Sequence, residues 1–202
     1  LSAGDLRALH RRLLVASNVV ISVAGGFSRR ELVAKLKVLL AGLPRGRAAA
    51  WTGAATMPAQ AGAFVEKQPR QQAIVYEAYP APALLAPDFY VGEVLDELFS
   101  GMSSRLFERV RDELGLAYFV RSSRIVGLDA GMFYFYAGTA PGSEAAVLAE
   151  VASEIKRVID GGVDAAELQR CQIRLKAARR MSLQSNAARA MQAGLNVLYG
   201  LP

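Results

Sequence analysis

Residues 101–118 read GMSSRLFERVRDELGLAY and predict an amphipathic helix followed directly by the start of a strand. On a helical wheel the large apolar side chains of this segment share one face: Leu106, Phe107, Val110 and Leu114. Gly115 predicts the end of the helix, since glycine is favoured just past the last helical turn. Arg111 falls beside Phe107 at the rim of the apolar face, where its stem can be buried while its guanidinium stays at an edge.

Tyr118 follows Arg111 at the start of the predicted strand. Alternation along that strand predicts two sets of side chains, one of Leu116, Tyr118 and Val120 and the other of Ala117, Phe119 and Arg121. Because the chain reverses sharply between helix and strand, the guanidinium of Arg111 and the hydroxyl of Tyr118 can meet at one opening. Two such donors suit a peptide carbonyl or a developing oxyanion. The residues alone leave this open, since an arginine near a tyrosine is common in proteins.

The rest of the chain predicts strands in adjacent pairs rather than in strict alternation with helices. The predicted strands are 18–24, 62–67, 71–79, 116–126 and 132–140, the last two forming a hairpin around Gly127 and Gly131. The predicted helices are one up to Leu14, one from Ser28 to near Gly42, and 88–99, 103–114, 141–159 and 164–198. This order favours an α+β fold, with a mainly antiparallel sheet covered by helices on one face.

The organisation into domains follows from the same pattern. Residues 44–61 are rich in Gly, Ala, Pro and Arg, lack periodicity and predict an internal loop. We expect residues 1–202 to form a single domain, and to be a fragment of a longer chain because the sequence begins at Leu1 rather than at methionine. No apolar run approaches the roughly 20 residues of a membrane span. The compartment stays open, cytoplasm and periplasm both being compatible with the sequence.

Composition excludes several classes of site. Of the 202 residues, 52% are hydrophobic and 21% are charged, which is an ordinary balance for a globular core. The single cysteine, Cys171, excludes an intramolecular disulfide and a cysteine-rich zinc module. The single histidine, His10, excludes any metal site that needs two histidines from this chain. We expect Cys171 to be a small buried residue of a helix and His10 to be structural.

The net charge of +6 is concentrated in the last part of the chain. Residues 168–202 contain no Asp or Glu and carry six basic residues: Arg170, Arg174, Lys176, Arg179, Arg180 and Arg189. A basic helix could meet nucleic acid or an anionic membrane. A solvated helix face is favoured instead, and no nucleic-acid partner is expected, because no aromatic residues alternate with these charges for base stacking.

Several motifs resemble the pitrilysin/insulinase family of zinc metallopeptidases, the inverzincins, which include the mitochondrial processing peptidases. Residues 101–118 match the family segment G-x-x-S-R-L-F-x-x-x-R-x-x-x-G-L-A-Y. The opening SAGDLRALH, the run NVVISVAG from Asn18, QQAIVY from Gln71 and GGVDAAEL from Gly161 resemble further family segments. The resemblance covers nearly the whole chain, and it is to the second, non-catalytic ("inactive") half of these proteins.

This resemblance implies a fold and a role. The fold would be one metallopeptidase half of LuxS/processing-peptidase-like architecture. In the family, the first half holds zinc through His-x-x-Glu-His, and the second half supplies an arginine and a tyrosine to the substrate. By resemblance, Arg111 would bind a substrate carbonyl and Tyr118 would polarise the scissile carbonyl or steady the tetrahedral intermediate. This chain has no His-x-x-Glu-His, so zinc is expected only in the complementary half.

The implied function is the non-catalytic, substrate-binding half of a protease that cleaves peptides or small proteins. Its expected partners are a zinc-bearing homologous half or subunit and a peptide substrate, held partly by strand addition to a sheet edge. A dimer is left open. Two alternatives also stay open: a structural subunit in which the Arg111–Tyr118 pair has no function, and a peptide-binding partner that takes no part in the chemistry.

Overall fold

The computed structural model describes residues 1–50, 61–101 and 103–201. The chain divides into two compact units. One unit is Ala54–Ala178, and the other combines Leu1–Gly53 with Arg179–Pro202. The predicted organisation of residues 1–202 as a single domain stays a prediction.

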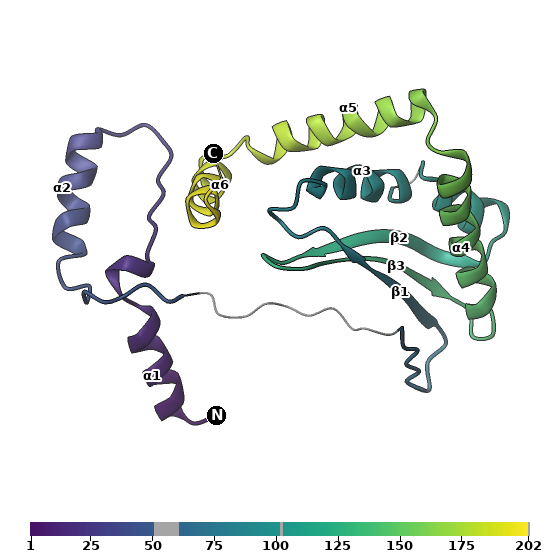
Figure 1. Cartoon of the computed structure of the whole chain (residues 1–202), viewed down its shortest axis with the longest axis horizontal. Coiled ribbons are helices and arrows are strands. Elements are labelled where there is room, and N and C mark those ends of the chain that lie inside the picture. Colours follow the sequence, from purple (N-terminus) through teal and green to yellow (C-terminus); the bar gives the residue numbers. More distant parts are fainter. Residues whose placement is uncertain (51–60, 102, 202) are drawn as a thin grey trace. The chain divides into compact units, whose positions relative to one another are not determined.

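The unit Ala54–Ala178 is built around a three-stranded antiparallel sheet (Figure 1). Its strands are β1 (Ala73–Ala81), β2 (Ala117–Val126) and β3 (Gly131–Thr139), in the order β1-β3-β2. The strands β2 and β3 are the predicted hairpin, and the turn between them is closed by a hydrogen bond from the amide of Gly127 to the carbonyl of Ala130 at 2.9 Å. The central strand therefore follows the two outer strands in sequence.

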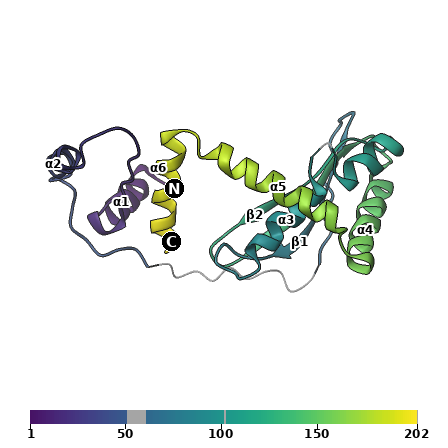
Figure 2. The ribbon, with the colours of Figure 1, turned by 90° about the horizontal axis from the view of Figure 1, so that it is seen from above.

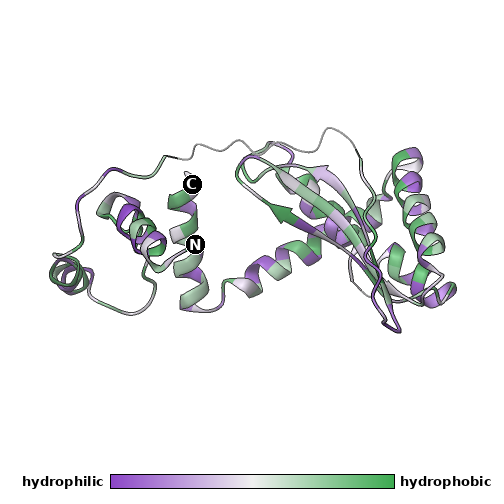
Figure 3. Ribbon diagram, turned by 90° about the horizontal axis from the view of Figure 1, so that it is seen from below, coloured by the Kyte–Doolittle hydropathy of each residue, from purple (hydrophilic) through white to green (hydrophobic). Residues whose placement is uncertain are grey.

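Helices pack on one face of this sheet. They are α3 (Phe89–Phe99), η2 (Phe107–Glu113), α4 (Glu144–Gly161) and the first part of α5 (Ala165–Ser182). In Figure 2, seen from above, α3 and α5 lie over the strands, whereas in Figure 3, seen from below, the strands lie in front. The core lies between helices and sheet and contains Leu98, Phe99, Leu106, Val110, Ala117, Val120, Phe135, Ala137, Val147, Val151 and Cys171. The predicted α+β fold and the burial of Cys171 are confirmed.

The second unit is helical. It contains α1 (Ala3–Leu13), the short turn η1 (Ala16–Asn18), α2 (Arg29–Leu39) and α6 (Asn186–Tyr199). A capping box opens α1, in which the amide of Asp5 donates to the Ser2 hydroxyl at 3.3 Å and the Asp5 carboxylate accepts from the Ser2 amide at 2.7 Å. The hydrogen bonds that the Asp5 carboxylate accepts from the Ser2 amide and from the Ser2 hydroxyl lower the pKa of Asp5. Ser28 caps α2 in the predicted place.

Two predicted strands are wrong. Residues 19–24 form no helix or strand, and Ile21 and Val23 remain exposed. Residues 62–67 form none either, and Phe64 and Val65 are exposed. Both runs have β-branched or aromatic residues, but strand propensity is realised only beside a pairing partner. In the described part of the chain neither run has one.

Two other predictions need adjustment. The helix expected over 164–198 is two helices, α5 and α6, because Ser185 starts a new helix by accepting a hydrogen bond from the amide of Ala188 at 3.1 Å. The loop expected over 44–61 stays a prediction: residues 44–50 and 61 form no helix or strand, and 51–60 lie outside the described residues. Within the described ranges, no helix combines the length and apolar composition needed to cross a membrane.

Candidate functional site

The helix that carries Arg111 is wound more widely than predicted. Residues 107–113 form a π-helix, and its end shows hydrogen bonds such as that from the amide of Leu114 to the carbonyl of Arg109, five residues back, at 3.2 Å. Gly115 ends it in the left-handed region at φ +61°. Single π-helical turns are rare and are found often at functional sites, since they shift the direction of the side chains that follow.

The structure brings Arg111 and Tyr118 together. The guanidinium carbon of Arg111 lies 4.5 Å from the ring centre of Phe107 and 5.9 Å from that of Tyr118. Arg111 is exposed, and Tyr118 is 76% exposed. Both side chains are therefore accessible, and the guanidinium is oriented by two aromatic rings rather than by a carboxylate.

A β-bulge at the start of β2 positions Tyr118. Ala117 pairs with Thr139 but Phe119 pairs with Gly138, so Tyr118 is the extra residue of β2. The predicted alternation is therefore wrong beyond this point: Ala117 and Val120 both face the core, and Tyr118 is not on the same side as Val120. A bulge of this kind redirects one side chain at the rim of a sheet. The hydroxyl of Thr139 donates to the carbonyl of Leu116 at 2.5 Å and so fixes the chain where it enters the bulge.

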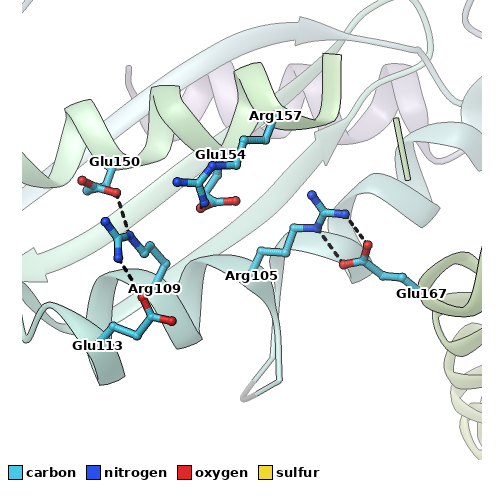
Figure 4. A network of polar contacts seen from close by, with 7 residues as sticks. All are labelled: Arg105, Arg109, Glu113, Glu150, Glu154, Arg157 and Glu167. Carbon is cyan, nitrogen blue, oxygen red and sulfur yellow. Dashed lines mark hydrogen bonds and ion pairs between the residues drawn. The ribbon is translucent and has the colours of Figure 1, made fainter. Parts of the chain in front are cut away.

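Ion pairs hold η2 and the residues just before it against α4 and α5 (Figure 4). Arg105 makes a two-pronged contact with Glu167 of α5, in which Nε lies 2.7 Å from Oε1. Arg109 reaches Glu150 of α4 at 3.2 Å and Glu113 of η2 itself at 2.7 Å. The hydrogen bonds to Glu167 raise the pKa of Arg105, and those to Glu113 and Glu150 raise the pKa of Arg109. These contacts fix η2, the helix that carries Arg111.

A cavity of about 400 Å³ lies among these charges, lined by Arg105, Glu108, Arg109, Glu113, Glu154 and Arg157. Arg157 pairs with Glu154, whose side chain is only 3% exposed (Figure 4). Each of these charges except Glu108 has an ion-pair partner, so the cavity is a structural feature of the helix packing rather than a second site.

Sequence reasoning missed this network. The partners of Arg105 and Arg109 in α5 and α4 lie 62 and 41 residues away, so no local pattern joins them. The signals in the sequence are the spacings of Arg109 with Glu113 and of Glu154 with Arg157, each of which puts the pair on neighbouring turns of a helix.

Zinc does not fit the described residues of this chain. Among them, no three His, Cys, Asp or Glu side chains gather where they could hold a metal ion. Cys171 is buried in the core, and burial raises the pKa of its thiol, which disfavours the thiolate needed for ligation. His10 lies in the last turn of α1. The described residues of this chain therefore offer no set of zinc ligands.

Comparison with known proteins points to one family. A family model described as the peptidase M16 inactive domain matches residues 1–175. The chain is 29% identical over 182 residues to an uncharacterized zinc protease of Rickettsia bellii, covering 90% of this chain and 43% of that protein. It is similar to the crystal structure of a peptidase M16 inactive domain from Pseudomonas fluorescens, with a TM-score of 0.85, 25% identity, and coverage of 100% of this chain and 48% of the other.

A protease from Helicobacter pylori has the same fold, with a TM-score of 0.87 at 23% identity over 99% of this chain and 50% of that one. The chain spans less than half the length of the curated relatives it matches, as with the 43% of the Rickettsia bellii protein.

Proposed function

The chain belongs to the family of peptidase M16 inactive domains, and from this premise we propose that it is the substrate-binding, non-catalytic half of a zinc metallopeptidase that cleaves peptides or small proteins. The resemblance to the pitrilysin/insulinase proteases, first seen in residues 101–118, is confirmed by the match to this family. The roles of individual residues are part of the proposal.

The observation that carries the proposal is the meeting of Arg111 and Tyr118 at the end of a π-helix, 5.9 Å apart from guanidinium carbon to ring centre. Each offers a hydrogen-bond donor that is open to solvent. Arg111 binds a backbone carbonyl of the peptide, and the hydroxyl of Tyr118 donates a hydrogen bond to the scissile carbonyl oxygen as negative charge develops there. Since β1 and β2 are the outer strands of the described sheet, their edges also offer backbone groups to an extended peptide.

The zinc ion and the general base belong, in this proposal, to a homologous half or partner subunit. When bound there, the metal would supply Lewis-acid activation of water and carbonyl. The residues of this chain bind and orient the substrate and stabilise developing charge. A zinc titration of this chain that gave tight one-to-one binding would contradict this division of roles.

The test is a pair of substitutions in the whole enzyme, made with its zinc-bearing half. We expect Arg111→Ala and Tyr118→Phe each to reduce transition-state stabilisation by about 2–4 kcal/mol, the usual loss for one oxyanion donor. Steady-state kinetics of peptide cleavage would measure this. Arg170→Ala and Tyr90→Phe are matched controls, because both residues are exposed and belong to α5 and α3 rather than to η2 or the bulge.

The kinetic pattern distinguishes the roles. A fall in kcat assigns the pair to the chemistry, whereas a rise in KM alone would make the chain a peptide-binding partner. Unchanged kcat and KM in both variants, with the controls also unchanged, would refute the proposed site and leave a scaffold.

A further inference from the structure

The face of the sheet opposite the helices is unusually aromatic. The alternate residues of the three strands place on it Ile74, Tyr76, Ala78, Pro80, Phe119, Arg121, Ser123, Ile125, Met132, Tyr134, Tyr136 and Gly138. We call this set the open face. Tyr76 is 66% exposed and Ile125 is 58% exposed. Contiguous exposed apolar surface is uncommon on a soluble protein and marks a place where something binds.

The rings of the open face form one packed cluster. Tyr76 stacks on Tyr136 with ring centres 5.9 Å apart and planes 14° apart. Phe119 and Tyr134 lie against the same Tyr136 ring at 5.7 and 5.8 Å. Gly138 makes room for Phe119, because a Cβ at that position would lie 2.4 Å from the ring atom Cε1. The cluster is therefore preformed, which lowers the entropy cost of binding to it.

The open face carries positive charge without compensation. Arg121 is its only charged residue, and it lies opposite Tyr136 in the pairing of β2 with β3. Within the described ranges Arg121 is exposed and has no ion-pair or hydrogen-bond partner. The only acidic residue of the three strands, Glu77, pairs with Phe135 and so belongs to the covered face. The complementary ligand brings both apolar groups and a negative charge.

We propose that the open face binds an extended peptide segment that carries aromatic or large apolar side chains next to an acidic side chain. The inference rests on the proposed function, and it names the substrate class. Phe119 directly follows Tyr118 in β2, so the open face continues from the candidate site. The aromatic cluster packs against the apolar side chains of the peptide, and Arg121 pairs with its carboxylate.

A second copy of this chain fits the open face less well. Packing two open faces together would bring two unpaired guanidinium groups to the interface, with no carboxylate on either face to meet them. Buried charges without partners weaken an interface. An acidic peptide supplies what the face lacks.

Binding of three labelled synthetic peptides to the whole enzyme, depleted of zinc by a chelator, tests the proposal. The peptides have equal length and alternate Phe with Glu, Phe with Lys, or Ala with Glu. By fluorescence anisotropy we expect the Phe/Glu peptide to bind about tenfold more tightly than either of the others. We expect Arg121→Gln to abolish the preference for Glu over Lys, and Tyr76→Ala to abolish the preference for Phe over Ala. Arg170→Gln and Tyr90→Ala are the controls.

Three outcomes would overturn the inference. One is equal affinity for the three peptides. Another is a preference for Glu that survives Arg121→Gln. The third is a Tyr76→Ala variant that dissociates from dimer to monomer by light scattering without losing peptide affinity, which would make the open face a contact between copies.

The proposed function fails in a different way. With zinc present, Arg121→Gln and Tyr76→Ala raise KM for the Phe/Glu peptide without changing kcat, whereas Arg111→Ala and Tyr118→Phe lower kcat. Loss of the first effect with the second retained overturns only the peptide preference. Loss of the second with the first retained overturns the assigned catalytic role and leaves a peptide-binding surface.

Discussion

The two faces of the sheet come from the same three strands and yet have opposite surroundings. On the covered face Val120 and Phe135 are almost completely buried beneath α3, η2 and α4. On the open face Tyr76 and Ile125 are largely exposed. Both faces are apolar, so hydrophobicity alone does not say which one a helix covers. An apolar face without a helix on it needs another explanation, and binding is the one that its charge supports.

The covered face also contains a buried arginine, Arg124. Arg124 points beneath α3 with its side chain only 6% exposed, and its guanidinium carbon lies 4.7 Å from the ring centre of Phe89. Its contact with Glu93 is long, at 3.8 Å, and its Nε and Nη2 atoms have no hydrogen-bond partner among the described residues. The Phe89 ring packs against this cation. Gly92 leaves space for it, since a Cβ at that position would lie 3.0 Å from the guanidinium carbon. Packing, rather than pairing, holds it.

The largest expected effect is a loss of unfolding free energy when a side chain packed against the covered face is shortened. Leu106 is fully buried in the core beneath the covered face. We expect Leu106→Ala to reduce the free energy of unfolding by about 2–5 kcal/mol, since a cavity adds to the lost transfer energy. Urea denaturation of the full chain would measure it.

Ile125→Ala is the matched control on the open face, with an expected change within about 0.5 kcal/mol. If Ile125→Ala were as costly as Leu106→Ala, then the open face would be buried in the folded protein. The distinction between the two faces, and the inference drawn from it, would then be lost.

The sequence predicts the features that depend on contacts between residues close to one another in the chain. The hairpin of β2 and β3, the helix α3 and the caps at Ser2 and Ser28 depend on residues close in sequence, and all were predicted. The meeting of Arg111 and Tyr118 was predicted for the same reason, because only Gly115 and a few residues separate them.

What the sequence could not predict depends on pairing at a distance. The run 18–24 has the composition of a strand, as β1 does, but β1 has β3 beside it and residues 19–24 have no strand partner in the described chain. The bulge at Tyr118 appears only when β2 is set against β3, since a single strand has no register. The contacts of Arg105 with Glu167 were missed because α5 lies far along the chain.

A smaller effect is expected from filling the one glycine of the open face. Gly138→Ala would place a methyl group within 2.4 Å of Phe119 and 2.7 Å of the Gln72 amide nitrogen, so that the Phe119 ring must move away from Tyr136. We expect a loss of about 1–3 kcal/mol in unfolding free energy, with a weaker near-ultraviolet circular dichroism signal from the aromatic cluster. In Gly161→Ala, the control, no atom lies within 4 Å of the new methyl group. A Gly138→Ala protein as stable as that control would show that the cluster is loosely packed.

The smallest expected effect concerns how the free energy of unfolding depends on pH, through Tyr79 on the covered face. Tyr79 lies on that face, where its hydroxyl donates to Glu77 Oε1 at 2.5 Å. The pKa of Tyr79 is raised from 10.0 to about 12. The largest cause is partial burial of the phenol, followed by its hydrogen bond to Glu77 and by the negative charge of the Glu77 carboxylate. The neutral phenol is therefore favoured in the folded chain. Between about pH 10 and 12 the unfolded chain releases this proton first, so the folded state loses stability as the pH rises through that window.

Tyr79→Phe removes this titration, so the variant is expected to lose less stability than the parent between pH 10 and 12, the window set by the raised pKa of Tyr79. Urea unfolding of both proteins across that window would measure the difference. Tyr90→Phe is the control for the loss of a phenol, because Tyr90 is exposed on α3. Equal slopes for Tyr79→Phe and the parent would mean that the hydroxyl of Tyr79 is as free in the folded chain as in the unfolded one. The covered face would then be open to water at its β1 edge, where β3 is the one strand partner of β1 among the described residues. The contrast with the open face would hold only beneath α3, η2 and α4.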